Sequence, residues 1–489
     1  MAGRLQGWGA MTETRSGDLI AALDEASLSR FHLRAVLVSG MGFFTDAYDL
    51  FVIGIASTLI TKQWHLSSGR LALLNSVMLA AAFLGALVFG RLADVAGRKR
   101  AYWMVAAIMI VGALGSALSP SYWMLIVFRF VLGFGVGGDY PVSAVMMSEY
   151  ANRKDRGKLV GMVFGTQALG LIVGPLVALA LLGGGASDTV TWRVLLGLGA
   201  VPAAAVLYLR LLMPESPRYQ VQVQGRAEQA ASQISAFTGG RVGGDGTAGP
   251  RQELGLRAFL TDRRWLIMLA GTAGTWFLLD YAYYGNTIST PQILGLISPH
   301  ASTTTKIALQ LAIFAVAAVP GYVLAIACLD RIGHRRLQWT GFAVMAACFL
   351  VIAAVPGMTT AVAPFLLVYG VSYFFTEFGP NMTTFIYPAE LFPTEVRTTG
   401  HGISAGAGKL GAFIGAFLFP DILGSHLGIR GAMTICAVVA AVGLLLTAFA
   451  LPETRGKSLE ELEESAFEAA PSKLRVQPAW PVRAAARRT

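Results

Sequence analysis

Charged residues are scarce in this sequence: aspartate, glutamate, lysine and arginine make up 13% of the 489 residues, whereas 55% are hydrophobic. Ordinary soluble domains carry about 25% charged residues. So few charges cannot cover the surface of a water-soluble body of this size, which excludes a typical soluble enzyme. The high apolar content excludes a disordered chain. The mean hydropathy of +0.59 predicts a protein that crosses the membrane several times.

Cysteine and histidine are also rare. Cys328, Cys348 and Cys436 lie in or at the edge of apolar stretches without the spacing of metal ligands. They predict neither a disulfide framework nor a zinc site. The six histidines lie at or beyond the ends of the apolar runs, and no nucleophile stands at a catalytic spacing from a base. We therefore expect neither enzyme activity nor a cofactor.

Twelve apolar runs are long enough to cross a membrane, which takes about 20 residues each. Their centres lie near residues 47, 82, 109, 133, 170, 202, 278, 316, 346, 374, 412 and 441. The predicted organisation is a leader (1–31), a six-helix half (32–213), a central loop (214–262), a second six-helix half (263–451) and a tail (452–489).

Lysine and arginine residues predict the orientation. Most of those outside the apolar runs fall on one side of the predicted membrane, and the loops of the other side hold Lys62, Arg70, Arg193, Lys306 and Arg430. Cytoplasmic loops carry the excess of basic residues. We therefore expect both termini in the cytoplasm of a multi-pass plasma-membrane protein. This topology explains the net charge of +10 without nucleic acid as a partner.

Two loop motifs recur at matching places. Asp94-Val95-Ala96-Gly97-Arg98 after the second run is repeated as Asp330-Arg331-Ile332-Gly333-His334 after the eighth. Pro214-Glu215 after the sixth run is repeated as Pro452-Glu453 after the twelfth. The offsets are 236 and 238 residues, which indicates a duplicated unit. The predicted fold is therefore an all-α membrane protein whose two pseudo-symmetric six-helix halves rock against each other.

The charges of these loops suggest gating. The pattern Gly90-x3-Asp94-x2-Gly97-Arg98 resembles the signature of the major facilitator superfamily, although Val95 stands where that family usually has a basic residue. Glu149 with Arg153, and Glu390 with Arg397, resemble the inner gate pairs of the same superfamily. Asp330 occupies the repeated position of Asp94. Arg129 opens the glycine-rich stretch 129–138 and is either a gating charge or a single charge in a helix packed through small residues.

Several polar residues lie within the apolar runs, where a charge costs about 3 kcal/mol and usually marks a pathway. Asp46 and Asp49 share one face of the first helix. Two carboxylates this close suit a proton-coupling site; the alternative is a pair satisfied by the backbone of a neighbouring helix. Trp276, Asp280 and Tyr284 form a stripe on the seventh helix. The other helices contribute Asp139, Tyr140, Gln167, Asn381 and Lys409.

The repeat places these residues around one axis, because an offset of about 240 carries Tyr140 onto Asn381 and Gln167 onto a neighbour of Lys409. A pocket on the pseudo-symmetry axis requires such a correspondence. The set suits a small oxyanion that carries a proton: Lys409 supplies a cation, and the acidic O–H of the anion can bond to Asp280. Fully ionised sulfate lacks that donor, so Asp280 would discriminate against it.

The helix motifs resemble the phosphate:proton symporter family of the major facilitator superfamily. The similar stretches are 42–51, Gly137-Gly138-Asp139-Tyr140-Pro141, 276–280, 378–385 and 401–409. The resemblance implies the major facilitator fold and proton-linked roles for Asp46, Asp49 and Asp139. It also implies a phosphate site made of Tyr140, Gln167, Trp276, Asp280, Tyr284 and Asn381, with Lys409 nearby.

Glu377 departs from that family, which usually has a neutral residue at this position. This carboxylate either disfavours an anion, takes part in coupling or faces another helix. The expected function is proton-coupled uptake of inorganic phosphate by a monomeric unit in the lipid bilayer. The alternatives are a transporter of another small solute (a sugar, an organic acid or a cation) and a sensor built on the same scaffold.

Overall fold

The computed structural model describes residues 14–238, 246–247 and 255–468. Helices account for nearly all of this part of the chain. The membrane-crossing helices of the first half are α2 (Arg30–Trp64), α3 (Ser68–Ala96), α4 (Arg98–Leu118), α5 (Tyr122–Tyr150), α6 (Arg156–Gly165) continued by α7 (Gln167–Gly183), and α8 (Asp188–Leu198) continued by α9 (Ala200–Leu212).

The second half repeats this series. Its helices are α13 (Arg263–Ile297), α14 (Thr303–Ile313) continued by the π-helix η1 (Phe314–Ala318) and α15 (Val319–Ile332), α16 (His334–Ala354), α17 (Val362–Phe378) continued by α18 (Pro380–Leu391), α19 (Arg397–Gly424) and α20 (Gly428–Ala450).

Eleven helices of the described residues are long and apolar enough to cross a membrane. The twelfth predicted crossing is α13, which matches α2 in length but carries the polar stripe around Asp280. Large apolar side chains lie exposed around the bundle, among them Phe449 at 86%, Val316 at 77% and Leu118 at 73%. Such a surface is stable in lipid and not in water, as the composition predicts.

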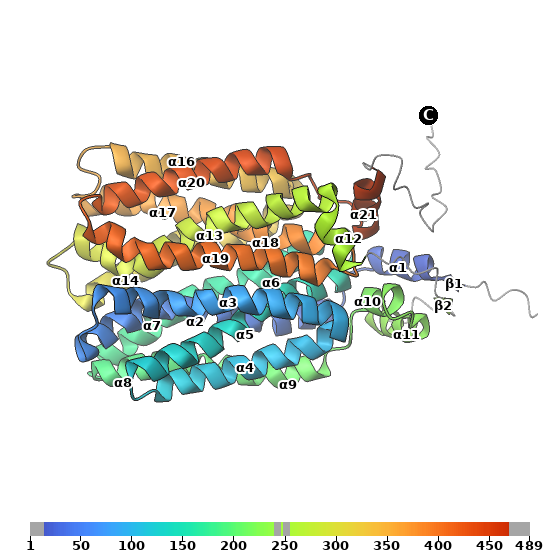
Figure 1. Ribbon diagram of the computed structural model, residues 1–489, viewed down its shortest axis with the longest axis horizontal. Coiled ribbons are helices and arrows are strands. Elements are labelled where there is room, and N and C mark those ends of the chain that lie inside the picture. Colours follow the sequence, from blue (N-terminus) through green and yellow to red (C-terminus); the bar gives the residue numbers. More distant parts are fainter. Residues whose placement is uncertain (1–13, 239–245, 248–254, 469–489) are drawn as a thin grey trace, which may run out of the picture.

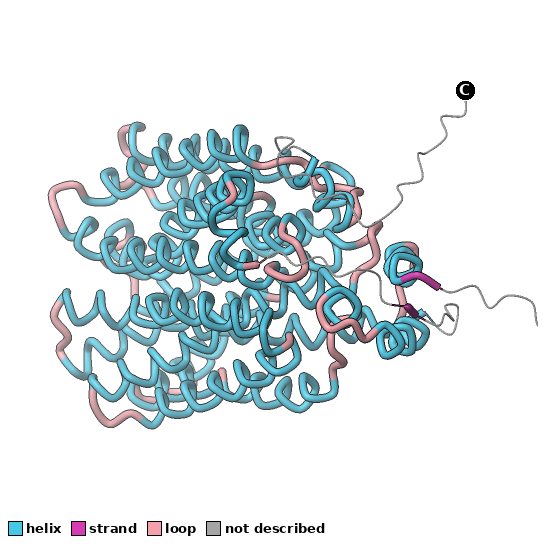
Figure 2. Tube along the Cα trace, turned by 45° about the vertical axis from the view of Figure 1, so that its right-hand side comes forward, coloured by secondary structure: helices cyan, strands magenta, loops and turns pink. Residues whose placement is uncertain are grey.

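The two halves lie side by side in Figure 1, with α2 to α9 below and α13 to α20 above. Between them, α3 packs along α19, α6 packs along α15, and α13 packs along α2. In the repeat, α3 corresponds to α15 and α6 corresponds to α19. The contact of α3 with α19 and the contact of α6 with α15 are therefore equivalent in the two halves. The tube in Figure 2 shows the same two layers from another direction.

Small residues set the spacing of α3 and α5. A Cβ added at Gly133 would lie 2.1 Å from the carbonyl oxygen of Met78, and one at Gly137 would lie 2.0 Å from that of Ala82. The glycine stretch after Arg129 therefore packs two helices at backbone contact.

Short elements gather at one end of the bundle, which we name the terminal face (Figure 1). They are α1 (Ser16–Asp24), α10 (Pro217–Gln222), α11 (Ala227–Thr238), α12 (Leu256–Thr261), α21 (Leu459–Glu468) and the paired strands β1 (Thr14–Arg15) and β2 (Gly246–Thr247). Ser458 and Glu461 exchange the hydrogen bonds of a capping box at the start of α21, which satisfies two backbone N–H groups at that end of the helix.

Arg218 joins three of these elements, because it forms ion pairs with Asp24 of α1 at 2.6 Å and with Glu460 of α21. Burial alone would raise the pKa of Glu460, but the charge of Arg218 lowers it. Burial raises the pKa of Asp24 despite the same arginine. The leader, the central loop and the tail are thus tied together by one buried cation.

Candidate functional site

A buried ion pair lies at the centre of the bundle. Lys409 of α19 extends its ammonium to Asp280 of α13, with 3.0 Å between Nζ and Oδ2. The same nitrogen donates to the hydroxyl of Tyr284 at 2.9 Å. It also lies 4.2 Å from the ring centre of Tyr140 and 4.4 Å from that of Tyr284. The ammonium is thus held by one carboxylate and two aromatic faces.

A chain of hydrogen bonds leads from this pair across both halves. The hydroxyls of Tyr284 and Tyr140 lie 3.3 Å apart, and Gln167 Nε2 donates to Tyr140 at 3.1 Å. Tyr322 donates to Gln167 Oε1 at 3.3 Å, and Asn381 Nδ2 donates to Tyr322 at 2.8 Å. Helices α5 and α7 of one half and α13, α15 and α18 of the other meet in this chain.

The structure therefore brings all seven predicted substrate residues together. Trp276 completes the set, because its ring centre lies 6.0 Å from that of Tyr140. Each of the seven side chains is at most 3% exposed. These residues are Tyr140, Gln167, Trp276, Asp280, Tyr284, Asn381 and Lys409.

Tyr322 belongs to the same network but was missed by sequence reasoning. It is 1% exposed and links Gln167 to Asn381 through its hydroxyl. In the sequence it is a single aromatic residue within an apolar run, a pattern that usually indicates core packing. The dipeptide Pro320-Gly321 directly before it, at the start of α15, was the available signal.

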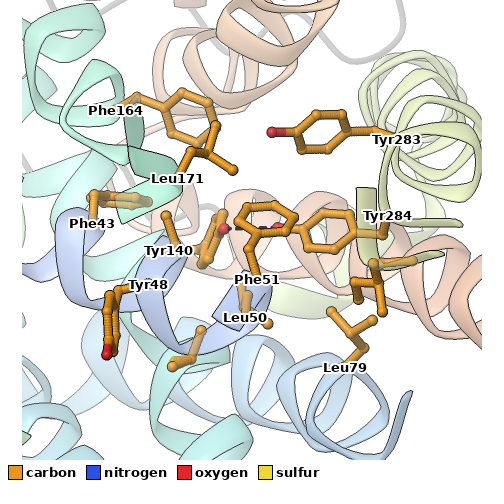
Figure 3. Close-up of a cluster of buried hydrophobic side chains, with 14 of the residues drawn as sticks. Phe43, Tyr48, Leu50, Phe51, Leu79, Tyr140, Phe164, Leu171, Tyr283 and Tyr284 are labelled. Carbon is orange, nitrogen blue, oxygen red and sulfur yellow. Dashed lines mark hydrogen bonds between the residues drawn. The ribbon is translucent and has the colours of Figure 1, made fainter. Parts of the chain in front are cut away.

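Aromatic rings cover the network on both sides. Toward the terminal face, Phe385 lies 4.9 Å from Phe43 and stacks on Phe164 at 4.4 Å. On the other side, Phe51 stacks on Tyr284 at 5.1 Å with an interplanar angle of 20°. Figure 3 shows Phe43 and Phe164 on one side of Tyr140, with Phe51 beside the hydrogen bond between Tyr140 and Tyr284. The polar chain is thus enclosed from both directions.

A second buried ion pair lies in the first half. Asp139 of α5 bonds to Arg210 of α9 at 2.7 Å and accepts from Ser143 at 2.9 Å. Gly42 of α2 makes room for it, since a Cβ there would lie 2.0 Å from Arg210 Nη2 and 2.5 Å from Asp139 Oδ2. Sequence reasoning missed Arg210, because it lies close to the end of its apolar run and resembles a topological loop charge.

Asp46 and Asp49 are fully buried, and no oxygen of either carboxyl group has a hydrogen-bond partner among the described residues. Asp46 lies one helical turn from Gly42, and therefore beside the pair of Asp139 and Arg210. Arg129 donates two hydrogen bonds of 3.1 Å to the backbone carbonyl of Asp49 and none to its side chain. An ionised carboxylate without partners is costly in such surroundings, so a bound proton stabilises either residue.

The alternative was that the backbone of a neighbouring helix donates hydrogen bonds to these carboxylates. No such bond is found among the described residues. Asp49 packs against the junction of α8 and α9, where a Cβ on Gly199 would lie 2.1 Å from Oδ1, but this is a steric contact without a donor. Arg129 contacts Asp49 near the centre of α2 and does not reach the charged cluster at the terminal face.

That cluster joins the two halves. Glu149 Oε1 of α5 lies 3.2 Å from Arg98 Nη2 of α4 and 3.2 Å from Arg397 Nη1 of α19. Asp94 of α3 lies 3.2 Å from the same Arg98 nitrogen. It also accepts hydrogen bonds from the backbone nitrogens of Thr398 at 3.2 Å and Thr399 at 2.6 Å. Asp94 therefore caps the first turn of α19 across the interface.

The second half repeats this cap. Asp330 of α15 accepts from the backbone nitrogen of Lys158, in the first turn of α6, at 2.9 Å. Glu390 of α18 lies 3.4 Å from His334 of α16, where the first half has Glu149 and Arg98. Each half thus caps the first turn of one helix of the other.

The partners within the predicted gate pairs require correction. Glu149 pairs with Arg98 and Arg397, whereas Arg153 lies at the surface, 3.1 Å from Glu461 of α21. Glu390 pairs with His334 and not with Arg397. Sequence neighbours are poor guides here, because the docking of the two halves determines which charges meet.

The repeated Pro-Glu motifs fasten the helix turns. Glu215 accepts from the backbone nitrogen of Lys99 at 3.3 Å, and Glu453 accepts from that of His334 at 3.0 Å. The glycines before these helices have φ values of +97° at Gly97 and +100° at Gly333. Only glycine adopts such angles without strain, and a Cβ would also strike the glutamate. Burial raises the pKa of Glu215.

Comparisons with known proteins agree with this architecture. The family model described as "Sugar (and other) transporter" matches residues 35–254 and 266–466. The chain is 38% identical to the probable inorganic phosphate transporter 1-6 of Arabidopsis thaliana, over 92% of this chain and 97% of the relative. It is 38% identical to the inorganic phosphate transporter 1-6 of Oryza sativa subsp. japonica, over 93% and 96%.

Among solved structures, the proton:xylose symporter XylE bound to 6-bromo-6-deoxy-D-glucose superimposes with a TM-score of 0.76 at 20% identity, over 90% of this chain and 100% of that one. A partially occluded inward-open conformation of XylE from E. coli gives 0.69 over 88% of this chain and 100% of that one, also at 20% identity. At this level of identity the likeness is one of fold.

Proposed function

This chain belongs to the inorganic phosphate:proton symporter family of the major facilitator superfamily, and on that premise we propose that it carries inorganic phosphate into the cell together with protons by alternating access. The observation that carries the proposal is the buried pair of Lys409 and Asp280, 3.0 Å apart within the second half, with the ammonium facing the ring of Tyr140 from the first half at 4.2 Å. It offers both a cation for an oxyanion and an acceptor for the proton on that anion.

Phosphate binds among the seven predicted substrate residues at the centre of the bundle. Lys409 neutralises the anion, and the amide of Asn381, that of Gln167 and the hydroxyls of Tyr140 and Tyr284 donate to its oxygens. Phosphate must displace hydrogen bonds that these groups now make with one another. That exchange keeps every donor satisfied in both states, so an empty transporter can also reorient.

Asp280 selects the anion. An ionised Asp280 repels a bare anion but accepts a hydrogen bond from the acidic O–H of phosphate, or donates to it when protonated itself. Sulfate at neutral pH has no O–H, and it meets the repulsion alone. A neutral sugar gains nothing from the charge of Lys409, which favours the oxyanion over the sugar alternative.

Asp46 and Asp49 take up the protons that move with phosphate, and Asp139, which is ion-paired with Arg210, belongs to the same proton pathway beside Asp46. The support is their burial without partners and the position of Asp46 one turn from the Asp139 pair. Proton binding removes two uncompensated charges from the interior of the first half, which lowers the cost of moving that half during transport.

The charges of the terminal face act as the gate. Asp94, Arg98, Glu149 and Arg397 hold that face closed, and Asp330, His334 and Glu390 do the same at the repeated position. In the proposed topology this face lies on the cytoplasmic side of the plasma membrane, and both termini lie in the cytoplasm. The working unit is a monomer. Opening requires breaking the helix caps made by Asp94 and Asp330.

The test is transport by purified protein in lipid vesicles with an imposed proton gradient. Labelled phosphate accumulates in the vesicles, arsenate competes and sulfate does not. The Asp280→Asn protein, which has neither the charge nor the acid, is expected to fail in accumulation. Glu228→Gln, at an exposed position of α11, is the matched control for carboxylate removal. Accumulation of xylose instead of phosphate would favour the sugar alternative and contradict the proposal.

A further inference from the structure

A carboxylate that the proposed function does not use lies at the far end of the polar chain. Glu377 is the penultimate residue of α17, and Asn381 lies in the first turn of α18 beyond a break at Gly379 and Pro380. Pro380 has no N–H to continue α17, and Gly379 allows close packing at the break, since a Cβ there would lie 2.6 Å from the carbonyl oxygen of Leu337. Glu377 Oε2 nevertheless accepts from Asn381 Nδ2 at 2.5 Å.

Glu377 is fully buried, and its second oxygen has no hydrogen-bond partner among the described residues. The titratable groups that face it are Tyr322 of α15, Tyr283 and Asp280 of α13 and Tyr373 of its own helix. Asp280 is ion-paired with Lys409, whereas none of these four groups around Glu377 is a cation. An ionised Glu377 therefore lacks a compensating charge.

Glu377 also competes with the substrate. The amide of Asn381 has two N–H groups; nitrogen Nδ2 donates to Tyr322 at 2.8 Å and to Glu377 at 2.5 Å. No donor of Asn381 remains for an anion while Glu377 holds it. Asp280 and Glu377 thus occupy opposite ends of one hydrogen-bonded chain, each bound to a donor that phosphate needs.

Protonation resolves this conflict. A neutral carboxylic acid attracts the amide less strongly than a carboxylate does, so Asn381 is released to a phosphate oxygen. The new O–H of Glu377 becomes a further donor, and the negative charge next to the arriving anion is removed. When phosphate leaves, Glu377 gives up the proton to water on the exit side and binds Asn381 again.

We propose that Glu377 is an additional proton-binding residue of the substrate site, which delivers Asn381 to phosphate on protonation and adds one proton to each transport cycle. This rests on the proposed function. Two consequences can be measured. The ratio of protons to phosphate falls by one when Glu377 is made neutral. The KM for phosphate also rises with pH more steeply in the native protein than in a variant with a neutral residue at 377. In the range in which Glu377 titrates, the additional rise is up to about tenfold per pH unit.

The experiment compares the native protein with Glu377→Gln and Glu377→Asn in proteoliposomes. For each, the proton gradient that just balances an opposing phosphate gradient gives the ratio of protons to phosphate, and this ratio does not depend on the amount of active protein. Glu228→Gln is the control and keeps the native ratio. Native protein that does not accumulate phosphate contradicts the proposed function itself.

The expected result is a native ratio that exceeds that of either variant by one, together with a flatter dependence of KM on pH in the variants. Native protein and variants with the same ratio and the same pH profile overturn the role of Glu377. Having two neutral variants of different length keeps the test decisive if one of them fails to fold. A variant that still transports phosphate with protons, at a ratio of protons to phosphate lower by one, supports the role of Glu377 and leaves the proposed function intact.

Discussion

Lys409 and Asp280 form an ion pair of 3.0 Å between α19 and α13, with both side chains 1% exposed. Two opposite charges at this depth are stable only together, since each pays for leaving water and regains energy from its partner. The pair is therefore both a structural link and the place where an anion can exchange one partner for another.

Replacing Lys409 with Met leaves Asp280 as a buried carboxylate without its cation. We expect a loss of about 3 kcal/mol of stability, the lower range for breaking a buried pair, and a loss of phosphate transport of at least about 100-fold. Thermal unfolding in detergent measures the first and vesicle uptake the second. The double variant with Asp280→Asn is expected to regain stability without regaining transport. Transport by the double variant would contradict the role of the pair.

Replacing Arg210 with Met removes the partner of Asp139, 2.7 Å away. The expected loss of stability is again about 3 kcal/mol. In the double variant with Asp139→Asn, most of this stability returns, because no isolated charge remains. The unfolding temperatures of the two single variants and the double variant give the interaction free energy between Arg210 and Asp139. Additive effects would show that the two residues do not depend on each other.

Replacing Glu149 with Gln removes the carboxylate that lies 3.2 Å from both Arg98 and Arg397. Two buried guanidinium groups then face each other across the interface, and the terminal face is expected to open more often. A cysteine in place of the buried Ser148, whose hydroxyl donates across the interface to the carbonyl oxygen of Ala389 at 3.0 Å, should react at least several-fold faster with a water-soluble thiol reagent.

The control for the gate variant is Glu461→Gln. It removes the exposed pair with Arg153, whose side chains are 49% and 51% exposed. Such surface pairs contribute about 0.2–1 kcal/mol, so the labelling rate should stay near that of the parent protein. Equal labelling in both variants would refute the gate.

Glu395 lies in the loop between α18 and α19, and burial raises its pKa to about 7 from 4.5, against the charges of Arg397 and Arg98. The folded protein thus binds a proton that the unfolded chain releases near pH 4.5. Stability therefore falls as pH rises from about 4.5 through 7, by at most about 3 kcal/mol. In Glu395→Gln this part of the pH dependence of the unfolding temperature should vanish. An unchanged pH profile would contradict this assignment.

The fold class was predictable because hydropathy, the positions of basic residues and two loop motifs at nearly equal offsets all indicate a duplicated membrane bundle. The same polarity argument found Asp280, Lys409, Tyr140 and Asn381, since charges and amides stand out in an apolar run. The structure brings them into a single hydrogen-bonded chain.

Other features were beyond the sequence for physical reasons. Tyr322 resembles an ordinary core aromatic until its hydroxyl is placed between two amides. Arg210 resembles a loop charge until α9 packs against α2 and α4 and its guanidinium group reaches Asp139 of α5. The partners of Glu149 and Glu390 depend on how two six-helix units dock, and local sequence carries no information about that docking.

The central claim, that phosphate and protons cross together at the site of Asp280 and Lys409, is tested most directly by reversing the driving force. Vesicles holding the native protein and a pH indicator receive an inward phosphate gradient with no imposed proton gradient and with the membrane potential clamped. The lumen is expected to acidify with phosphate and the native protein, and not to acidify with sulfate or with the Asp280→Asn protein. Phosphate entry through the native protein with no more acidification of the lumen than in vesicles with Asp280→Asn would contradict the central claim.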